Sequence, residues 1–428
     1  MGNLKREVNR REFARLFAAG GSAALFLRAG MTWPQAAEFQ AAPAMSADPW
    51  EAVRAQFVMP PDMGVMNAAN LCPSPLPVLE AMYSNTKDMD ADPSFQNRAK
   101  MSDGKDMARQ TLADYLNVSV DEIVITRNTS ESNNIVSSGI ELGPGDEVLL
   151  FSDNHPSNNA AWKTKAERFG FTVKYVEQVN PHPGADYYLD AFSQAIGPAT
   201  RVVAFTHLTN TVGDLFPARE LCQLARERGA LSLVDGAQTF GLMNVDLADM
   251  QPDFYSGSAH KWPCGPKEVG VLYVNQGALD RLWPSVVSAG AGPNLASRKI
   301  EALGQRDEPA IIAFAEAIKM HQKIGKQAIQ DRSLELAQRL MEGLKTIEGV
   351  TLWTNPDPKL SAAVVSFQPG NLDARQLHAA LYENDRIGSA SRGGDDRGGI
   401  RISPHFYNLP SEIDRAVDAV KRYMSTGL

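Results

Sequence analysis

The chain lacks the features that mark several common protein classes. Only three of its 428 residues are cysteines, Cys72, Cys222 and Cys264, and no two of them form a CxxC pair. This scarcity argues against a disulfide framework, and we expect no Cys72–Cys264 bridge. No GxGxxG turn follows a first strand, and no HExxH pair occurs among the seven histidines. We therefore expect neither a nucleotide-dependent oxidoreductase nor a metal site.

Positive charge is also scarce. The chain has 42 Lys and Arg residues against 50 Asp and Glu residues, a formal net charge of −8. A nucleic-acid-binding protein needs a basic surface to neutralise phosphates, so we expect no nucleic-acid partner. With 43% hydrophobic and 21% charged residues, the chain can bury the core of a globular protein of roughly two domains.

The first 45 residues differ from the rest. Asn9-Arg10-Arg11-Glu12-Phe13 is a twin-arginine pattern, and the weakly apolar stretch 16–27 that follows is too short to span a membrane. Residues 1–45 are thus predicted to be a twin-arginine export signal, cleaved near residues 37–46; an ordinary amphipathic helix is the alternative. Because this export machinery carries folded proteins, an enzyme can cross with its cofactor. We expect the mature protein in the periplasm.

Beyond residue 46, short apolar runs alternate with helical patterns. The runs predict buried strands at 122–126, 147–151, 172–176, 202–206, 232–234 and 269–274. This alternation indicates an α/β fold with a large, mostly parallel mixed sheet. After Pro309 the pattern predicts a helix through 310–347, a strand at 362–367, a helix at 374–384 and a loop at 388–399. We expect an N-terminal arm at 46–75, a large domain at 76–305 and a smaller C-terminal α/β domain at 306–428.

Two motifs point to chemistry at the sheet edge. Ser256-Gly257-Ser258-Ala259-His260-Lys261-Trp262 places a lysine in a tight loop of small residues. Packing and nearby positive charge lower the pKa of such an amine, so that it can attack a carbonyl. Upstream, an apolar strand ends at Asp235, where ligands bind in open α/β sheets. A buried carboxylate needs a cationic partner, such as the pyridinium nitrogen of pyridoxal 5'-phosphate (PLP). A surface lysine and a helix-capping aspartate are the alternatives.

A third motif suits a phosphate group. Thr126-Arg127-Asn128-Thr129-Ser130-Glu131-Ser132-Asn133 follows another strand and opens a helix. Hydroxyl side chains and free N–H groups at a helix N-terminus bind anions, although plain N-capping is an equal alternative. Together, the three motifs predict an enzyme that holds PLP as a Schiff base on Lys261.

The motifs, in this order, resemble the class V aminotransferase family of fold-type I PLP enzymes, which includes cysteine desulfurases and isopenicillin-epimerase-like proteins. The resemblance covers about residues 67–408. It implies that Lys261 carries the cofactor, Asp235 pairs with its ring nitrogen and His155 stacks on the ring. The other cofactor contacts that it implies are Thr129, Ser130, Asn210, Gln238, Ser258 and His260. It also implies a homodimer with shared sites, where Gln305 reaches the neighbour's phosphate, and a substrate carboxylate bound by Arg401 with help from Asn67.

Two features narrow the function that this resemblance implies. Cysteine desulfurases of the family carry a nucleophilic cysteine in the loop that aligns with residues 387–396, which has none here, so we expect a different activity. The combination of a twin-arginine signal with the Lys261 motif resembles family members that act in the periplasm in pyoverdine maturation. That similarity implies conversion of the glutamate side group of a siderophore precursor to succinamide. A periplasmic aminotransferase or lyase for free amino acids, and a catalytically inactive binding protein, are the alternatives.

Overall fold

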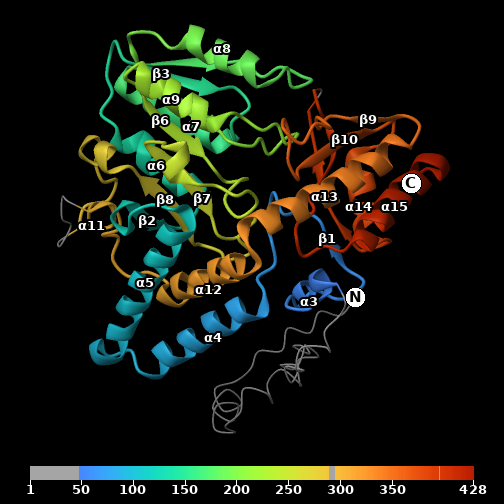
Figure 1. Cartoon of the computed structure of the whole chain (residues 1–428), viewed down its shortest axis with the longest axis horizontal. Coiled ribbons are helices and arrows are strands. Elements are labelled where there is room, and N and C mark those ends of the chain that lie inside the picture. Colours follow the sequence, from blue (N-terminus) through green and yellow to red (C-terminus); the bar gives the residue numbers. More distant parts are fainter. Residues whose placement is uncertain (1–47, 289–294, 395) are drawn as a thin grey trace, which may run out of the picture. The chain divides into compact units, whose positions relative to one another are not determined.

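The computed structural model describes residues 48–288, 295–394 and 396–428, and the chain divides into two compact units. The first unit, residues 1–55, is described only at its end, where Asp48 caps helix α3 (Pro49–Arg54). The predicted export signal and its cleavage region lie outside the described residues. The second unit, residues 56–428, contains the three sheets that the described residues form, and the site (Figure 1). No described helix has the length and apolar character needed to cross a membrane.

A seven-stranded sheet forms the centre of the second unit. Strand β8 runs antiparallel to its neighbours β2 and β7, and every other adjacent pair is parallel. The α/β fold with a mostly parallel mixed sheet is therefore confirmed. In spatial order the strands are β2 (Ile123–Thr126), β8 (Gly270–Val274), β7 (Phe254–Ser258), β6 (Leu231–Asp235), β5 (Thr200–Thr206), β3 (Glu147–Phe151) and β4 (Thr172–Val176).

Both faces of this sheet are buried, which explains the continuous apolar runs in the sequence. Alternate residues of one strand belong to different cores: Val203 and Phe205 of β5 lie in one hydrophobic cluster, and Val202 and Ala204 lie in the other. The helical segments that connect the strands are η1 (Val120–Glu122), α6 (Thr129–Gly139), α7 (Pro156–Phe169), α8 (Ala185–Ala195), α9 (Ala218–Glu227), α10 (Leu247–Met250), η2 (Gln276–Arg281) and α11 (Ala296–Ile300).

Longer helices flank the sheet. Helix α12 (Glu308–Ile324) packs against α4 (Leu76–Ala91) and α5 (Phe95–Leu116), as Figure 1 shows. The predicted helix through 310–347 is in fact two helices, because α12 ends at Gly325 and α13 (Lys326–Lys345) begins after it. Gly325 has a φ of 100°. Glycine adopts such a conformation without steric cost, which lets the chain change direction there.

A smaller antiparallel sheet follows, in the order β12 (Ala390–Arg392), β13 (Gly399–Ile402), β10 (Val365–Pro369) and β9 (Val350–Leu352). It packs with α13 and α14 (Ala374–Glu383), and α15 (Pro410–Thr426) packs against both of these helices. The start of the unit joins this part of the chain, because β1 (Gly64–Val65) pairs with β11 (Ile387–Gly388) in parallel. The pairing continues where the Ala68 N–H donates to the Ser403 carbonyl at 3.1 Å. The predicted boundaries of the arm and the two domains stay predictions.

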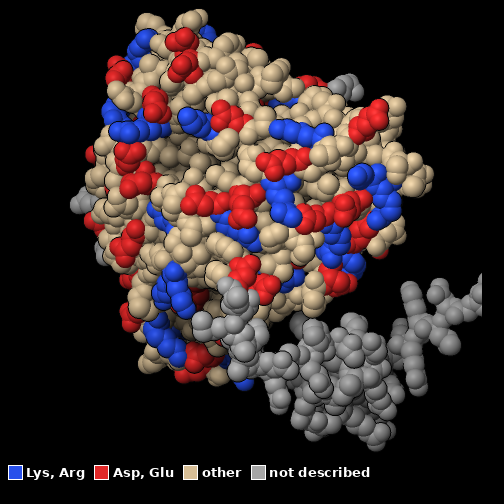
Figure 2. Space-filling view, turned by 45° about the vertical axis from the view of Figure 1, so that its right-hand side comes forward, with Lys and Arg blue, Asp and Glu red and all other residues tan. Residues whose placement is uncertain are grey.

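The surface carries charges of both signs. Figure 2 shows one face on which Lys and Arg side chains are interspersed with Asp and Glu side chains, without a continuous basic area. Phosphate contacts along a nucleic acid would need such an area, and this face does not offer one.

Candidate active site

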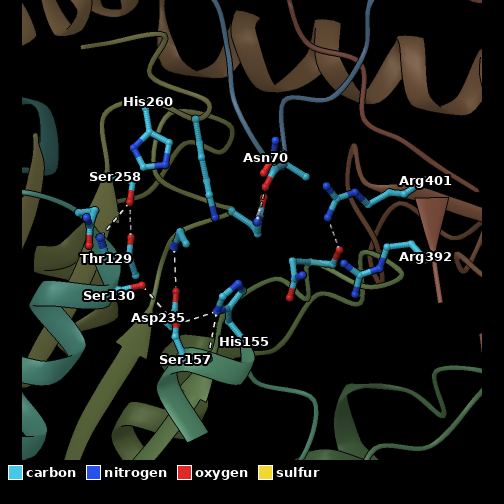
Figure 3. A pocket seen from close by; sticks show the side chains of 16 residues that line it. Asn70, Thr129, Ser130, His155, Ser157, Asp235, Ser258, His260, Arg392 and Arg401 are labelled. Carbon is cyan, nitrogen blue, oxygen red and sulfur yellow. Dashed lines mark hydrogen bonds between the residues drawn. The ribbon is translucent and has the colours of Figure 1, made fainter. Parts of the chain in front are cut away.

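A cavity of about 320 Å³ gathers most of the predicted site residues (Figure 3). Its walls come from the loops that follow strands β2, β3, β5, β6 and β7 and from strands β12 and β13 of the smaller sheet. This is the edge at which parallel strands end and where ligands bind in open α/β sheets. The predicted residues that line it are Thr129, Ser130, His155, Asn210, Asp235, Gln238, Ser258, His260, Lys261 and Arg401.

Lys261 lies in a tight turn after β7. The Cys264 N–H donates to the Lys261 carbonyl at 2.9 Å, and the neighbouring Trp262 is completely buried. The Trp262 indole N–H donates to Gln238 Oε1 at 2.8 Å, which anchors the turn to the loop after β6. Burial lowers the pKa of Lys261 to about 8; Asp235 opposes this shift and the charge of Arg401 adds to it. The amine is therefore mostly protonated at pH 7, but its free fraction is far larger than that of an ordinary lysine.

Asp235 ends β6 and is held by two donors. Its Oδ2 accepts from Asn133 Nδ2 at 2.9 Å, and its Oδ1 accepts from the Ala237 N–H at 3.0 Å. Asn133 Oδ1 in turn accepts from the Ser256 hydroxyl at 2.7 Å, which fixes the orientation of the amide. The two N–H donors fix the orientation of the carboxylate, which suits a partner for a protonated ring nitrogen.

Sequence reasoning missed Asn133 as a site residue. It follows Thr129 by four residues on α6, and residues at this spacing lie on the same face of a helix. The spacing of Thr129 and Asn133 therefore indicated that Asn133 shares a helix face with a predicted site residue. Its contact with Asp235, which lies 102 residues away in the sequence, depends on the fold and could not be predicted.

The N-terminus of α6 forms one end of the cavity. Ser258 Oγ accepts from the Thr129 N–H at 2.9 Å and lies 2.8 Å from Thr129 Oγ1. Figure 3 shows Thr129, Ser130, Ser258 and His260 grouped there. Burial and the charges of Lys261 and Lys267 lower the pKa of His260 to about 4, so its ring is neutral at pH 7. Hydroxyls, a neutral imidazole and a helix N-terminus form a suitable phosphate cradle.

His155 caps α7 at the side of the cavity. Its Nδ1 accepts from the Ser157 N–H at 3.3 Å, so the ring proton of the neutral form is on Nε2. Desolvation, followed by the charge of Lys261, lowers the pKa of His155 below its ordinary value. A neutral imidazole can lie against an aromatic ring without adding charge, as the resemblance implies.

Arg401 forms the opposite end of the cavity. It is 4% exposed, and its Nη1 donates to the Asn210 carbonyl at 2.8 Å. Its Nη2 donates to Asn67 Oδ1 at 3.1 Å, whereas its buried Nε has no hydrogen-bond partner among the described residues. Burial lowers the pKa of Arg401 to about 10, and the charge of Arg392 adds to this shift. A buried guanidinium with a free donor fits an anionic ligand such as a carboxylate.

Two predicted residues do not line the cavity. Asn67 contacts Arg401 and positions it from behind. Gln305 Oε1 accepts from Arg98 Nη2 at 2.5 Å, outside the cavity, and its contact with a neighbouring subunit stays a prediction. The structure also adds cavity residues that sequence reasoning did not assign to the site: Ala69, Asn70, Asn128, Ser157, Ala237 and Arg392.

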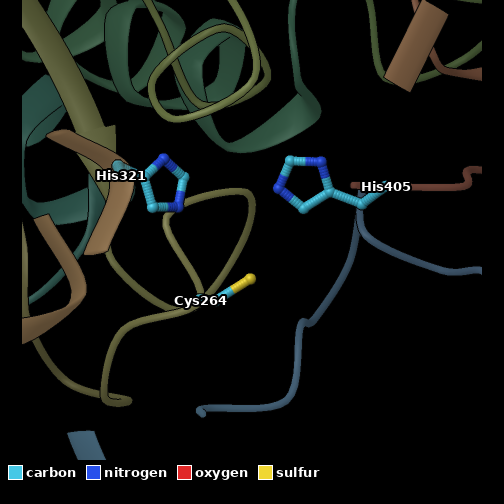
Figure 4. Close-up of side chains that lie close together, drawn as sticks. All are labelled: Cys264, His321 and His405. Atoms are coloured by element: carbon cyan, nitrogen blue, oxygen red, sulfur yellow. The ribbon is translucent and has the colours of Figure 1, made fainter. Parts of the chain in front are cut away.

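A separate buried cluster contains Cys264, His321 and His405, whose potential metal-ligand atoms all lie within 4.8 Å of one another (Figure 4). The seven histidines are scattered in the sequence, and the fold brings two of them together. Both ring nitrogens of His405 are engaged, with Ser333 Oγ at 3.0 Å and the Trp262 carbonyl at 2.7 Å. His405 is thereby anchored to the Lys261 turn, whereas neither ring nitrogen of His321 has a hydrogen-bond partner among the described residues. Cys72, Cys222 and Cys264 are free and buried.

The cavity as a whole fits PLP. It has a hydroxyl-lined helix N-terminus for the phosphate, a carboxylate held by N–H donors, and an amine of lowered pKa. The buried Nε of Arg401, which lacks a partner among the described residues, leaves a donor for the carboxylate of an amino compound. These groups meet in one cavity although they are far apart in the sequence.

Comparison with known proteins agrees with this geometry. Residues 67–416 match the family described as aminotransferase class-V. Isopenicillin N epimerase from Streptomyces clavuligerus is 31% identical over 88% of this chain and 98% of its own length. The apo structure of a cysteine desulfurase from Thermococcus onnurineus NA1 has a TM-score of 0.82 and 26% identity, over 90% of this chain and all of that one. A mutant of the cystine C–S lyase C-DES, with glycine covalently linked to its PLP cofactor, has a TM-score of 0.77 and 25% identity, over 86% and 98% of the two chains.

These comparisons correct one expectation. The exclusion of cysteine desulfurase activity was wrong, because relatives and structural neighbours of this chain are named cysteine desulfurases. One from Methanothermobacter thermautotrophicus, named a probable cysteine desulfurase, is 28% identical over 88% of this chain and 98% of its own length. A missing cysteine in the 387–396 loop is a single local difference, and it does not outweigh similarity over the whole fold. The family model and the cavity together lead to one assignment: this chain belongs to the class V aminotransferase family and is a PLP-dependent enzyme of the isopenicillin N epimerase-like type.

Proposed function

We propose that the chain is an exported enzyme that acts at Cα of an amino-acid group in the periplasm. We further propose that its substrate is the glutamate group of a pyoverdine-type siderophore precursor, which it converts to succinamide. The observation that carries the chemistry is the Lys261 amine, with a pKa of about 8, in one cavity with Asp235 and Arg401. The twin-arginine pattern supports export. The substrate is supported by the resemblance, noted from the sequence, of an export signal joined to this kind of site to periplasmic family members of pyoverdine maturation.

The chain's own groups divide the work at Cα. Bound PLP supplies an electron sink for the negative charge that develops there. Arg401 binds the α-carboxylate and thereby determines which bond to Cα stands perpendicular to the cofactor ring. Lys261, as a free amine, removes or returns the Cα proton. Asp235 would pair with the ring nitrogen of the bound cofactor, and His155 would lie against its ring and exclude water.

The proposed conversion removes the α-carboxyl group as carbon dioxide and oxidises Cα to the level of an amide. With dioxygen as the oxidant, one glutamate group and one O₂ give one succinamide group, one CO₂ and one water. The amine nitrogen remains as the amide nitrogen, so no separate ammonia donor is needed. The free α-amine and α-carboxylate of the substrate are both used.

The assay incubates PLP-loaded protein with the glutamate-bearing precursor in air. We expect a product lighter by CH₂O for each group and a matching consumption of O₂, both absent with Lys261→Ala. Formation of a keto acid, or turnover of free amino acids but not of the precursor, would contradict the proposed siderophore substrate. Sulfide release from L-cysteine is measured in the same preparation, because relatives are named cysteine desulfurases.

Export is tested by changing Arg10→Lys together with Arg11→Lys. We expect the protein to remain in the cytoplasm, whereas unchanged appearance in the periplasm would contradict a twin-arginine signal. The activity of the purified double variant serves as the control, because these residues lie far in sequence from the site.

We also infer a homodimer. Large apolar side chains are exposed on neighbouring helices, with Tyr83 of α4 at 60%, and Phe95 and Met107 of α5 at 87% and 63%. Exposed apolar side chains of this size mark association surfaces. Light scattering should give twice the mass of one chain. Gln305→Ala should then weaken PLP binding if Gln305 reaches the neighbour's phosphate; unchanged binding would contradict that role.

A further inference from the structure

Arg392 is a second guanidinium in the active-site cavity. It lies on β12 beside β13, which carries Arg401, and both side chains are at the end of the cavity away from Ser258 and His260 (Figure 3). The smaller sheet therefore provides the cavity with two cations where the cofactor phosphate does not bind.

The register of the two strands explains this placement. Ala390 lies directly opposite Arg401, and Arg392 lies opposite Gly399. Residues two apart on a strand point to the same face, as do residues directly opposite on antiparallel strands. Arg392 and Arg401 are therefore diagonal neighbours on one face, with backbone positions about 7–8 Å apart. At this spacing the two guanidinium groups lie side by side, and each can bind a different oxygen atom of a ligand.

Arg392 has no partner of its own. Among residues 48–288, 295–394 and 396–428, none forms a hydrogen bond or ion pair with its side chain. The nearby carboxylate of Asp153 is taken: its Oδ2 accepts from Arg397 Nη1 at 3.0 Å and from the Thr211 hydroxyl at 2.5 Å. Burial is the main influence on the pKa of Arg392, which is lowered. The donors of this half-buried guanidinium can bond water in the cavity, and an oxygen acceptor on a ligand can replace that water.

The two arginines at this end of the cavity thus have different roles. Arg401 is held by Asn210 and Asn67 in a fixed orientation, as a receptor for one carboxylate requires. Arg392 is not held, and its donors are available for a second group. Among the described residues that line the cavity, Asp235 is the only acidic one, and it accepts a hydrogen bond from Asn133.

We propose that Arg392 binds a second oxygen acceptor on the substrate, a γ-carboxylate or γ-amide carbonyl, and so selects glutamate-like groups over amino acids with an apolar side chain. This inference rests on the proposed function and deepens it, because it states what the site recognises beyond the groups on Cα. A free acid and a peptide-linked glutamate share this chemistry, and the test distinguishes them.

The test measures dissociation constants of amino compounds for the PLP-loaded protein, from the change in cofactor absorbance. The three compounds are L-glutamate, γ-L-glutamyl methylamide and L-norvaline, which has the same carbon chain without the γ-oxygens. We expect the protein to bind at least one γ-oxygen compound about 10-fold or more tighter than norvaline, as a charged hydrogen bond implies. Tighter binding of the amide identifies a peptide-linked substrate, and tighter binding of the acid identifies a free one.

Variants assign the preference to Arg392. Arg392→Met should reduce the preference to near parity by weakening the γ-oxygen compounds far more than norvaline, and Arg392→Lys should restore part of the preference. Arg375→Met, an exposed arginine of α14, is the matched control and should change nothing. Retained PLP absorbance and thermal unfolding show that each variant is folded.

Four results would overturn the inference. An unchanged preference in Arg392→Met would remove Arg392 from recognition. Equal weakening of all three compounds would assign Arg392 to the α-carboxylate. If the unaltered protein responds to none of the three compounds, the proposed function fails with the inference, whereas binding of norvaline as tightly as the others leaves Cα chemistry intact and defeats the inference alone.

Discussion

Asn133 Nδ2 donates a 2.9 Å hydrogen bond to Asp235 Oδ2 between two buried residues. Ser256 donates to the other side of the amide, so the NH₂ group faces the carboxylate and cannot be flipped without loss of both bonds. The carboxylate assigned to the cofactor ring is therefore oriented by a helix that also carries the phosphate cradle. A shift of α6 would disturb both contacts together.

We expect Asn133→Ala to weaken PLP binding by about 10-fold, because Asp235 and Ser256 each lose a buried partner. Titration of the cofactor-free protein with PLP measures this loss. The control is Asn134→Ala, the adjacent exposed asparagine of α6, which should bind PLP normally. Equal binding by the two variants would show that Asn133 does not position Asp235.

Lys261→Ala should abolish covalent attachment of the cofactor. After borohydride reduction, the unaltered protein should carry the cofactor mass on the peptide that contains Lys261, and the variant should carry none. Lys267→Ala, an exposed lysine six residues later, should behave like the unaltered protein. Cofactor mass on another lysine would refute the assignment of Lys261.

The rate of cofactor attachment should depend on pH. The pKa of Lys261 is lowered to about 8, so the amine is mostly protonated below this pH and mostly free above it. Only the free amine attacks a carbonyl, so the rate should rise with pH through about 8 and then level off. Stopped-flow absorbance at pH values on both sides of 8 measures the profile. Because Asp235 raises the pKa of Lys261, Asp235→Asn should move the midpoint to lower pH; a rate that falls with rising pH would contradict the mechanism.

Gly213→Ala should destabilise the fold and the site together. Gly213 has a φ of 77°, and an added Cβ would lie 2.3 Å from the Val364 carbonyl oxygen. We expect a loss of about 2 kcal/mol or more in the free energy of unfolding, because strain and overlap combine. Urea unfolding measures it, with Gly197→Ala as the control because no atom lies within 4 Å of its added Cβ. Equal stability of the two variants would refute this account.

The sequence predicts the large sheet well because strands buried on both faces need continuous apolar residues. It also predicts the residues at strand ends, such as Asp235, because the edge of a parallel sheet is a general binding position. It does not predict Arg392, whose role depends on strand register in the smaller sheet. The sequence also does not predict that Cys264, His321 and His405 lie close together, because their proximity depends on tertiary packing. The exclusion of cysteine desulfurases failed for a similar reason, since one loop position cannot represent a whole fold.

The bond between Asn67 and Arg401 joins residues 334 positions apart, and strand β1 pairs with β11 over a similar distance. The carboxylate-binding end of the cavity therefore cannot exist on a nascent chain until nearly all of it has left the ribosome. Contacts between such distant segments also close slowly during folding. Selection of a substrate, unlike formation of the large sheet, must then be among the last properties that a newly made molecule acquires.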